Sequence, residues 1–424
     1  MNNFINILLW VVYVISLYFS VFLFLVYVDK KNKFREEESS LVLPTEPIIT
    51  VIVPAYNEEE TIIKTLESIY NLDYPKSKLE VIVVNDGSKD KTEEQVINYI
   101  KNKPYFKLIS HLNIGKAASL NKAISLAKGL FFACLDADSV VDPLTLRRML
   151  SLYYRENDPD LAVITPAMKI YQPKNIIQKV QWIEYLVIIL IARISSHLDS
   201  LYVAPGPFSI YKTNIIKKLG GFDEKNITED QEIAYRLQKH HYRIKQCFNA
   251  YVYTTAPKKI KPFYRQRRRW YLGSISCISK YRQLIANRRY GDFGMMQMVK
   301  NVLGYLLAVT GIIAAIYIFL IPLIRHLKNL WIIDLNIIPY IKNFEINITW
   351  LGFLTADFRK GTIIIFIFLI GLYLFYQAHR NANERMLKLG FIPLIPYFGF
   401  YYLLKGIILL LSVLEFARSR KLKW

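Results

Sequence analysis

Residues 79–92 read LEVIVVNDGSKDKT, an apolar run of β-branched residues that passes directly into a polar turn. Two further apolar runs lie at residues 48–53 and 131–135, and each also ends in polar residues. Between these runs, residues 58–70 and 92–101 have the periodicity of amphipathic helices. Strands that alternate with helices predict an α/β domain with a parallel sheet, in which the ligand lies beyond the carboxyl ends of the strands.

The composition of the whole chain indicates a membrane protein. Of its 424 residues, 53% are hydrophobic and 21% are charged, yet the formal net charge is +21. A basic surplus on an apolar chain is typical of a membrane protein whose polar part faces anionic lipid. Nucleic acid is the rival partner, but it would leave the apolar excess unexplained, and we expect no nucleic-acid partner. The three cysteines form no CxxC pair, and we expect them to be reduced.

The amino terminus predicts a retained membrane helix. Residues 4–28 are an almost unbroken apolar run, long enough to cross a hydrocarbon core of about 30 Å. A cleaved signal peptide would need an amino-terminal charge and a small-residue cleavage site, which this run lacks. Lysines follow the run, and the positive-inside rule therefore places that end inside and the amino terminus outside. We expect residues 1–46 to form this helix and a basic linker.

A second membrane region is predicted at residues 291–424. Residues 302–323 and 362–376 are good spanning candidates. Residues 391–416 are apolar but interrupted by two prolines and a lysine, so they form either one broken helix or a re-entrant piece followed by a helix. Residues 330–354 carry three charged side chains, and we expect them to lie on the membrane surface.

Two questions of topology stay open in the sequence. Three carboxy-terminal crossings would put the basic tail RSRKLK (418–423) outside, against the positive-inside rule, whereas two or four would put it inside. Residues 182–194 could form an amphipathic helix on the membrane surface or a core helix of the α/β domain.

The acidic motif Asp136-Ala137-Asp138 follows the apolar run at residues 131–135. Two carboxylates at a strand end repel each other unless a positive group lies beside them. A hard divalent cation with oxygen ligands would supply that charge, and phosphate oxygens often complete its ligand set. Most DxD sequences are solvated turns, so this motif gains weight from its place after a buried strand and from the motifs that accompany it.

The polar loops after the first two strands add candidates for a ligand site. In NDGSKDKT (85–92), the glycine allows a turn with positive φ, and Asp86 is placed to accept a base N–H. In PAYNE (54–58), Tyr56 offers a face on which a base can stack, and Glu58 offers another acceptor. Ordinary loops between strands and helices have a similar composition, so these loops alone do not decide the function.

PAYNE, NDGSKDKT, NIGK (113–116) and DAD occur here in the order and spacing of family 2 glycosyltransferases, which the chain resembles over about residues 48–275. The resemblance implies a GT-A fold, a Rossmann-like α/β domain, joined here to an α-helical transmembrane region. It also implies roles for six residues: Tyr56, Glu58 and Asp86 near the uracil, Lys116 and Asp136 along the nucleotide, and Asp138 on Mg²⁺ or Mn²⁺.

ITED (227–230) resembles the TED motif of the same family. An inverting transferase needs a carboxylate that takes the acceptor hydroxyl proton as the oxygen attacks the anomeric carbon. Asp230 is our candidate for this base, and Glu229 is the less favoured one by the family resemblance only. Thr228 or Asp230 could also cap a helix at residues 231–239, and both roles can coexist.

QRRRW (266–270) resembles the QxxRW motif of processive family members, which include poly-N-acetylglucosamine, hyaluronan, chitin and cellulose synthases. We assign Gln266 to the substrate site with this motif. Arg267 and Arg269 suit a leaving diphosphate, because guanidinium donors match phosphate oxygens in geometry and charge. Trp270 offers a flat face for a sugar ring. Alone this segment would indicate a basic patch beside a membrane, but the order DAD, TED, QRRRW favours a catalytic site.

VAPGPFSIY (203–211) lies between DAD and TED and resembles the acceptor-side loop of the family. Gly206 would let the backbone come close to a ligand. The GP type of this loop also occurs in hyaluronan and chitin-type synthases, so the choice of sugar stays open.

These motifs together predict a multi-pass enzyme of the cell membrane with a cytoplasmic catalytic domain at residues 47–290. We expect an inverting, metal-dependent transfer of a sugar, with N-acetylglucosamine favoured, from a UDP-sugar to a growing polysaccharide. The layout most resembles poly-β-1,6-N-acetylglucosamine synthases, so we expect processive synthesis coupled to export, contact with membrane lipid and room for an accessory membrane subunit.

Two alternatives accompany this prediction. The first is a non-processive transferase of the same fold that glycosylates a membrane lipid. The second is a non-catalytic membrane scaffold that binds a sugar nucleotide. The joint presence of Asp138, Asp230 and Arg269 argues against the scaffold.

Overall fold

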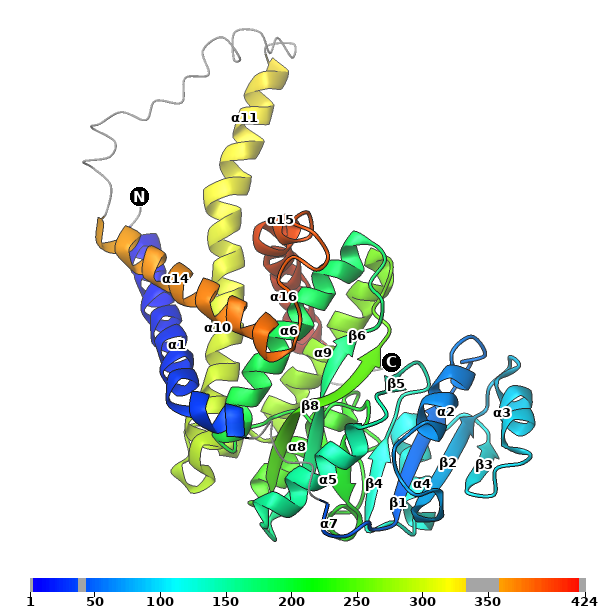
Figure 1. Ribbon diagram of the computed structural model, residues 1–424. Coiled ribbons are helices and arrows are strands. Elements are labelled where there is room, and N and C mark those ends of the chain that lie inside the picture. The colour runs from blue at the N-terminus through cyan, green and yellow to red at the C-terminus, as the bar shows by residue number, and fades with distance from the viewer. Residues whose placement is uncertain (1–2, 37–42, 333–357, 419–424) are drawn as a thin grey trace.

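The computed structural model describes residues 3–36, 43–332 and 358–418 (Figure 1). The segment at residues 330–354, which we predicted to lie on the membrane surface, falls almost entirely outside the described residues. The described chain has two parts, an α/β domain and a group of long apolar helices.

An eight-stranded mixed sheet is the centre of the α/β domain. In order across the sheet its strands are β3 (Phe106–His111), β2 (Leu79–Asp86), β1 (Ile49–Ala55), β4 (Phe131–Cys134), β7 (Ile210–Lys212), β6 (Leu161–Ile170), β8 (Arg243–Thr254) and β5 (Val140–Val141). The three predicted strands are confirmed as β1, β2 and β4, and neighbouring strands among them are parallel. They are buried along their length, which explains why they are continuous apolar runs.

Helices cover both faces of this sheet. One core is shared with α2 (Ile62–Tyr70), α3 (Thr92–Ile100) and α5 (Thr145–Glu156), and the other with α4 (Lys116–Leu126), α7 (Thr213–Lys218) and α8 (Glu229–Lys239). The two predicted helices are confirmed as α2 and α3. Helix α2 begins later than predicted, at Ile62, because the residues before it form a turn. The predicted α/β class is therefore correct. The predicted parallel sheet is correct for β1, β2 and β4, whereas β7 and β5 pair with their neighbours in the antiparallel direction.

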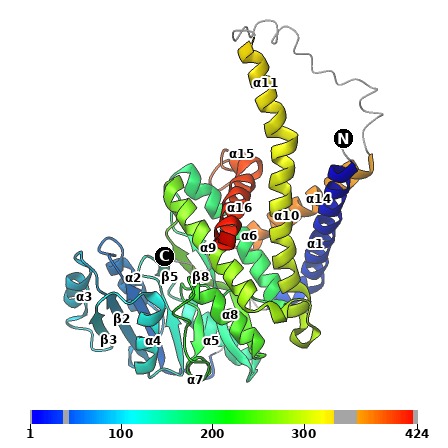
Figure 2. The same cartoon turned by 180° about the vertical axis from the view of Figure 1, so that it is seen from behind.

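Within the described ranges, four helices are long and apolar enough to cross a membrane by length and composition. These segments are Asn6–Asn32, Phe293–Ala315, Phe358–Asn381 and Leu394–Arg418. They correspond to α1 (Asn3–Glu36), α10 (Val299–Ala315), α14 (Phe358–Asn381) and the run of α15 (Leu394–Pro396) into α16 (Tyr402–Arg418). Each overlaps a predicted membrane segment, and the last one is a helix with a π-helical turn at Tyr397–Tyr401 rather than two separate pieces. Helix α10 continues through a similar turn into α11 (Ile321–Ile332), which projects away from the sheet (Figures 1 and 2).

Two further helices connect the sheet to the apolar helices. Helix α6 (Ile176–His197) packs against β6 and β8 and also contacts α1 and α14, while α9 (Ile260–Lys280) packs against α8 and α16. Trp182, Leu186 and Leu190 of α6 are all buried. This burial favours the interpretation of residues 182–194 as a core helix.

Candidate active site

The loops that follow β1 and β2 are joined by hydrogen bonds. The backbone N–H of Asn57 donates to Ser88 Oγ at 3.0 Å, and the backbone N–H of Lys89 donates to Asn57 Oδ1 at 2.8 Å. These bonds fix the PAYNE loop beside the NDGS loop at the carboxyl edge of the sheet. Tyr56, in the first loop, is 45% exposed, so its ring is accessible to a ligand.

Asp86 holds the loop that precedes α4. Its carboxylate oxygens accept hydrogen bonds from the backbone N–H groups of Ile114 (2.8 Å) and Gly115 (3.0 Å). The side chain is only 4% exposed, and His111 Nδ1 lies 3.4 Å from it. Gly115 has a φ of 92°, which a residue with a Cβ rarely adopts. Asp86 therefore orients the start of α4, a role that the sequence did not reveal, and its contact with a base stays a prediction.

Lys116 is the positive centre of an acidic cluster. Its Nζ lies 2.6 Å from Asp136 Oδ1 and 3.0 Å from Glu229 Oε1. Burial alone would lower the pKa of Lys116, but Asp136 and Glu229 outweigh burial and raise it, so the amine stays charged. This contact joins the DAD motif after β4 to the first turn of α8. Lys116 thus provides part of the positive charge that the two carboxylates of the DAD motif require.

Asp138 lies in a strongly negative environment. Burial, then the charges of Asp136 and Glu58, raises the pKa of Asp138 to about 6. Burial is also the main cause that raises the pKa of Glu58. Surroundings that disfavour a carboxylate anion favour a cation beside it. Among the described residues, no group of three or more His, Cys, Asp or Glu side chains is arranged to hold a metal ion.

Asp230 faces the same cluster from the first turn of α8. Burial and the charge of Glu229 raise its pKa to about 6, while Lys116 and Arg269 act in the opposite direction. Asp230 Oδ1 also accepts a hydrogen bond from the backbone N–H of Gln231 at 2.8 Å, so the side chain stabilises the helix start as well. A buried carboxylate with a pKa near 6 can accept a proton at neutral pH.

Gly206 lies against the ion pair of Lys116 and Asp136. A Cβ at this position would stand 3.1 Å from Lys116 Nζ and 3.4 Å from both oxygens of Asp136. The same loop is fixed to α8, because the backbone N–H of Ala204 donates to the carbonyl of Asp230 at 3.2 Å. The loop before β7 therefore passes between the DAD and ITED motifs, close to both.

Helix α9 brings the QRRRW motif to this cluster. It packs on α8 through a hydrogen bond of 2.9 Å from Gln231 Nε2 to Ser274 Oγ and an ion pair of 2.7 Å between Lys280 and Glu232. Of the three arginines of the motif, Arg269 lies close enough to Asp230 to lower the pKa of that carboxyl group. The structure thus brings Lys116, Asp136, Glu229, Asp230 and Arg269 together, with Asp138 and Gly206 beside them.

The other two arginines point to carboxylates outside this cluster. Arg267 is 2% exposed and pairs with Glu184 of α6 at 2.5 Å, and Arg268 forms a two-point ion pair with Glu415 of α16. The guanidinium of Arg267 also lies 4.2 Å from the ring centre of Trp270. Because Arg267 pairs with Glu184 in this arrangement, Arg269 is the arginine of the motif whose position agrees with the predicted contact with a diphosphate. Gln266 is half-buried on the same helix.

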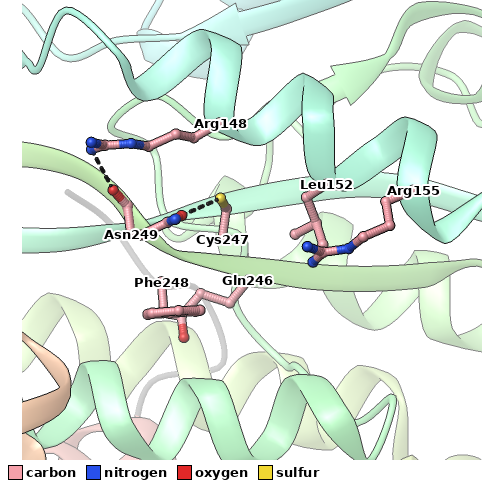
Figure 3. A pocket seen from close by; sticks show the side chains of 7 residues that line it. All are labelled: Arg148, Leu152, Arg155, Gln246, Cys247, Phe248 and Asn249. Carbon is pink, nitrogen blue, oxygen red and sulfur yellow. Dashed lines mark hydrogen bonds between the residues drawn. The ribbon is translucent and has the colours of Figure 1, made fainter. Parts of the chain in front are cut away.

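A separate hollow lies between α5 and β8 (Figure 3). Its lining residues all come from these two elements, and inside it Arg148 Nη1 donates to the carbonyl of Asn249 at 2.7 Å while Cys247 Sγ lies 3.2 Å from Asn249 Oδ1. Its guanidinium groups are part of the packing of α5 on β8.

Residues 50–220 match the family model described as glycosyl transferase family 2. A poly-beta-1,6-N-acetyl-D-glucosamine synthase of Staphylococcus epidermidis is 26% identical over 374 residues, which cover 88% of this chain and 84% of that protein. The synthase of the same name from Staphylococcus aureus (strain COL) is 30% identical over 276 residues, or 65% of this chain and 63% of that one. Among solved structures, the mannosyltransferase PcManGT from Pyrobaculum calidifontis, in complex with GDP-Man and Mn²⁺, matches with a TM-score of 0.54. It is 21% identical and the match covers 76% of this chain and 92% of that chain, which shows a shared fold.

The fold and these matches define a class: the chain is a glycosyltransferase with the GT-A fold. Residues 50–220 match glycosyl transferase family 2, and the chain is similar over most of its length to poly-beta-1,6-N-acetyl-D-glucosamine synthases.

Proposed function

We propose that the protein transfers N-acetylglucosamine from UDP-N-acetylglucosamine to a growing β-linked polysaccharide at the cytoplasmic face of the cell membrane. The observation that supports this most is the convergence of three separate motifs: Lys116 pairs with both DAD after β4 and ITED at the start of α8, and Arg269 of QRRRW on α9 lies close to Asp230 of ITED. The similarity to poly-beta-1,6-N-acetyl-D-glucosamine synthases supports the choice of sugar and polymer.

Asp230 acts as the general base in this proposal. It takes the proton of the acceptor hydroxyl while that oxygen attacks the anomeric carbon from the face opposite UDP, which inverts the configuration. With a pKa of about 6, Asp230 is mostly ionised at pH 7 and more basic than an exposed carboxylate. Glu229 does not compete for this role, because Lys116 engages its carboxylate at 3.0 Å.

The donor side is formed by residues from several of the motifs. Arg269 donates to the oxygens of the leaving diphosphate, and its charge stabilises the negative charge that develops there. Lys116 and Asp136 lie along the nucleotide, with Gly206 leaving room beside them. Tyr56, Glu58 and Asp86 bind the uracil, and Gln266 and Trp270 contribute to the substrate site from α9.

Asp138 would hold one Mg²⁺ or Mn²⁺ ion together with phosphate oxygens. The negative surroundings of Asp138 fit a cation, and Asp136 is engaged by Lys116, which leaves Asp138 as the carboxylate for the metal. A site of one carboxylate and two phosphate oxygens needs no preformed cluster of protein ligands. When bound, the ion would offset the charge of the leaving diphosphate.

We assign each of the three segments predicted from the sequence to the membrane or to the cytoplasm. Residues 1–46 anchor the chain, residues 47–290 form the cytoplasmic catalytic domain, and residues 291–424 form the second membrane region. Helix α6 contacts both the sheet and the apolar helices, and α9 contacts α8 and α16, so a growing chain that leaves Asp230 would meet the membrane region next. Processive transfer, export and an accessory membrane subunit are part of this proposal.

Purified protein in detergent with Mn²⁺ tests the proposal. We expect UDP-N-acetylglucosamine to give more UDP release than UDP-glucose or UDP-glucuronate, and product analysis to show a polymer. One sugar per lipid would favour the lipid transferase instead. UDP binding without UDP release from any of the three donors would favour the non-catalytic scaffold.

A further inference from the structure

Glu184 joins three helices from distant parts of the chain. Its Oε2 lies 2.5 Å from Arg267 Nη2 of α9 and accepts a hydrogen bond from Tyr401 OH at 2.6 Å. Its Oε1 lies 2.5 Å from Lys405 Nζ of α16. Glu184 itself belongs to α6 and is 3% exposed. One buried carboxylate thus connects the α/β domain, the helix of the QRRRW motif and the last apolar helix.

The charge of Glu184 is essential to this cluster. Burial alone would raise the pKa of Glu184, but Arg267 and Lys405 outweigh burial and lower it to about 2. The cluster contains two cations and one anion, so loss of the carboxylate charge would leave two buried cations without a counter-ion. Breaking a buried ion pair by removing one partner is strongly destabilising, whereas intact pairs contribute little to net stability. The cluster therefore adds little to the free energy of unfolding. Its main effect is to fix how the three helices pack against one another.

The cluster also lies next to the acidic site. Tyr185, the next residue of α6, is buried, and burial raises its pKa to about 12. Arg267 lowers that pKa, while Glu184, Asp138 and Asp136 add to the increase. Tyr185 thus lies within the electrostatic reach of both the ion cluster and the DAD motif.

Helix geometry explains how Glu184 would act on catalysis. Successive residues of an α-helix are rotated by about 100°, so Arg267 and Arg269 point in directions about 160° apart. With Arg267 fixed on Glu184, α9 is rotated so that Arg269 is directed toward α8 and Asp230. A rotation of α9 would move Arg269 away from the acidic cluster without changing any other residue of that cluster.

We propose that Glu184 is a positioning residue: its contact with Arg267 fixes the rotation of α9 so that Arg269 faces Asp230. The proposal rests on the proposed function of that site. Glu184 acts through Arg267 and touches no substrate.

The test compares Glu184→Gln with Glu415→Gln. Both variants remove one carboxylate charge from a pair with an arginine of QRRRW, but the pair of Arg268 and Glu415 is partly exposed and directed away from Asp230. UDP affinity, measured by calorimetry with Mn²⁺, should fall less than kcat in Glu184→Gln, because Arg269 is displaced from the diphosphate while the other nucleotide contacts remain. It should stay within about twofold of the parent in Glu415→Gln. The kcat of sugar transfer should fall about 10- to 100-fold in Glu184→Gln, the range for a displaced catalytic group, and about twofold at most in Glu415→Gln.

Glu184→Asp is the variant that keeps the charge. It shortens the side chain by one methylene, so it should fold even if the glutamine variant does not. The proposal expects an intermediate kcat, with a UDP affinity closer to that of the parent than in Glu184→Gln. A parent-like kcat in both Glu184 variants, or a loss of UDP affinity in proportion to kcat, overturns it.

A distance measurement separates this inference from the proposed function. Spin labels at Lys261→Cys on α9 and Asn98→Cys on α3 report the position of α9, because both sites are exposed and the three native cysteines are buried. Glu184→Gln should broaden or shift the distance distribution, and Glu415→Gln should not. An unchanged distribution in Glu184→Gln contradicts the positioning role alone. A parent protein that binds UDP but transfers no sugar contradicts the proposed function alone.

Discussion

Gly273 of α9 packs directly against Thr228 of the ITED motif: a Cβ on Gly273 would stand 2.2 Å from Thr228 Oγ1 and 2.3 Å from its Cγ2. Both residues are buried. The backbone of α9 thus touches the start of α8 without a side chain between them. This close approach is what allows Arg269 to influence Asp230, and it makes a glycine at this position a requirement of the active site.

Gly273→Ala should therefore separate the two motifs. The added methyl group meets Thr228 at less than contact distance, and overpacking of this kind costs about 1–3 kcal/mol in the free energy of unfolding. We expect a lower midpoint of thermal unfolding in detergent and a fall in UDP release of about tenfold, because Arg269 moves with α9. Gly304→Ala in α10 is the matched control, since a Cβ there meets nothing within 4 Å of the described structure. A Gly273→Ala protein with parent-like turnover would argue against the need for close contact.

Asp230→Asn should retain UDP binding and lose transfer by at least about 10²-fold, the low end for loss of a general base. The amide keeps the size of the side chain but cannot accept the acceptor proton. Calorimetry with UDP and a coupled assay of UDP release measure the two effects separately. Asp223→Asn, at a carboxylate that pairs with Lys280 away from the cluster, is the control and should remain active. Near-normal turnover of Asp230→Asn would remove this residue from the role of base.

The pH dependence of transfer should report the same carboxylate. Burial and Glu229 raise the pKa of Asp230 to about 6, and only the ionised form can take a proton. As the pH falls through about 6, kcat/KM should decline, approaching tenfold per pH unit in the acid range, whereas it should be level between pH 7 and 8. Asp138 titrates near the same pH, so the decline should be measured with saturating Mn²⁺, which keeps that carboxylate ionised. A decline centred near pH 4 would contradict a base with a raised pKa.

Removal of the metal should act through Asp138. Chelation with EDTA should lower UDP affinity in the parent by about tenfold or more, because the diphosphate loses its bound cation. Asp138→Asn should show that lower affinity already with Mn²⁺ present, and EDTA should change it little further. The readout is UDP affinity by calorimetry, which needs no turnover. An Asp138→Asn protein that still responds to Mn²⁺ as the parent does would place the metal elsewhere.

The strands of the first half of the domain could be predicted because they are buried on both faces. Such strands are continuous apolar runs with turn residues at their ends, as β1, β2 and β4 are. β8 was not predicted, since its twelve residues alternate between buried and half-buried positions and include Arg243, Lys245 and Gln246. Its pairing with β6 depends on contacts between segments that are distant in sequence, which periodicity within one segment does not reveal.

The residues of the candidate site could be predicted from the sequence, but the contacts between them could not. The motifs marked Lys116, Asp136 and Asp230, and the structure brings these residues together. The ion pair between Lys116 and Glu229 was missed, because no pattern in the sequence links the NIGK loop to α8. Glu184 was also missed as a partner of Arg267. A lone glutamate in the apolar segment at residues 182–194 was the available signal, since a buried charge requires a counter-ion.

The last prediction concerns Trp270 of α9, whose ring centre lies 4.2 Å from the guanidinium of Arg267 and which packs against the apolar cluster that includes Phe263 and Tyr401. If the ring holds an acceptor sugar, Trp270→Ala should raise the acceptor KM about tenfold, which corresponds to roughly 1–1.5 kcal/mol of stacking. Hydrolysis of the donor in the absence of acceptor should change much less, because Asp138 and Arg269 remain. Trp270→Phe keeps a flat ring for both the sugar and Arg267 and should recover most of the loss, so it controls for a disturbed Arg267. Equal losses of transfer and hydrolysis in Trp270→Ala would instead show that the ring supports the fold of α9 and does not bind the acceptor.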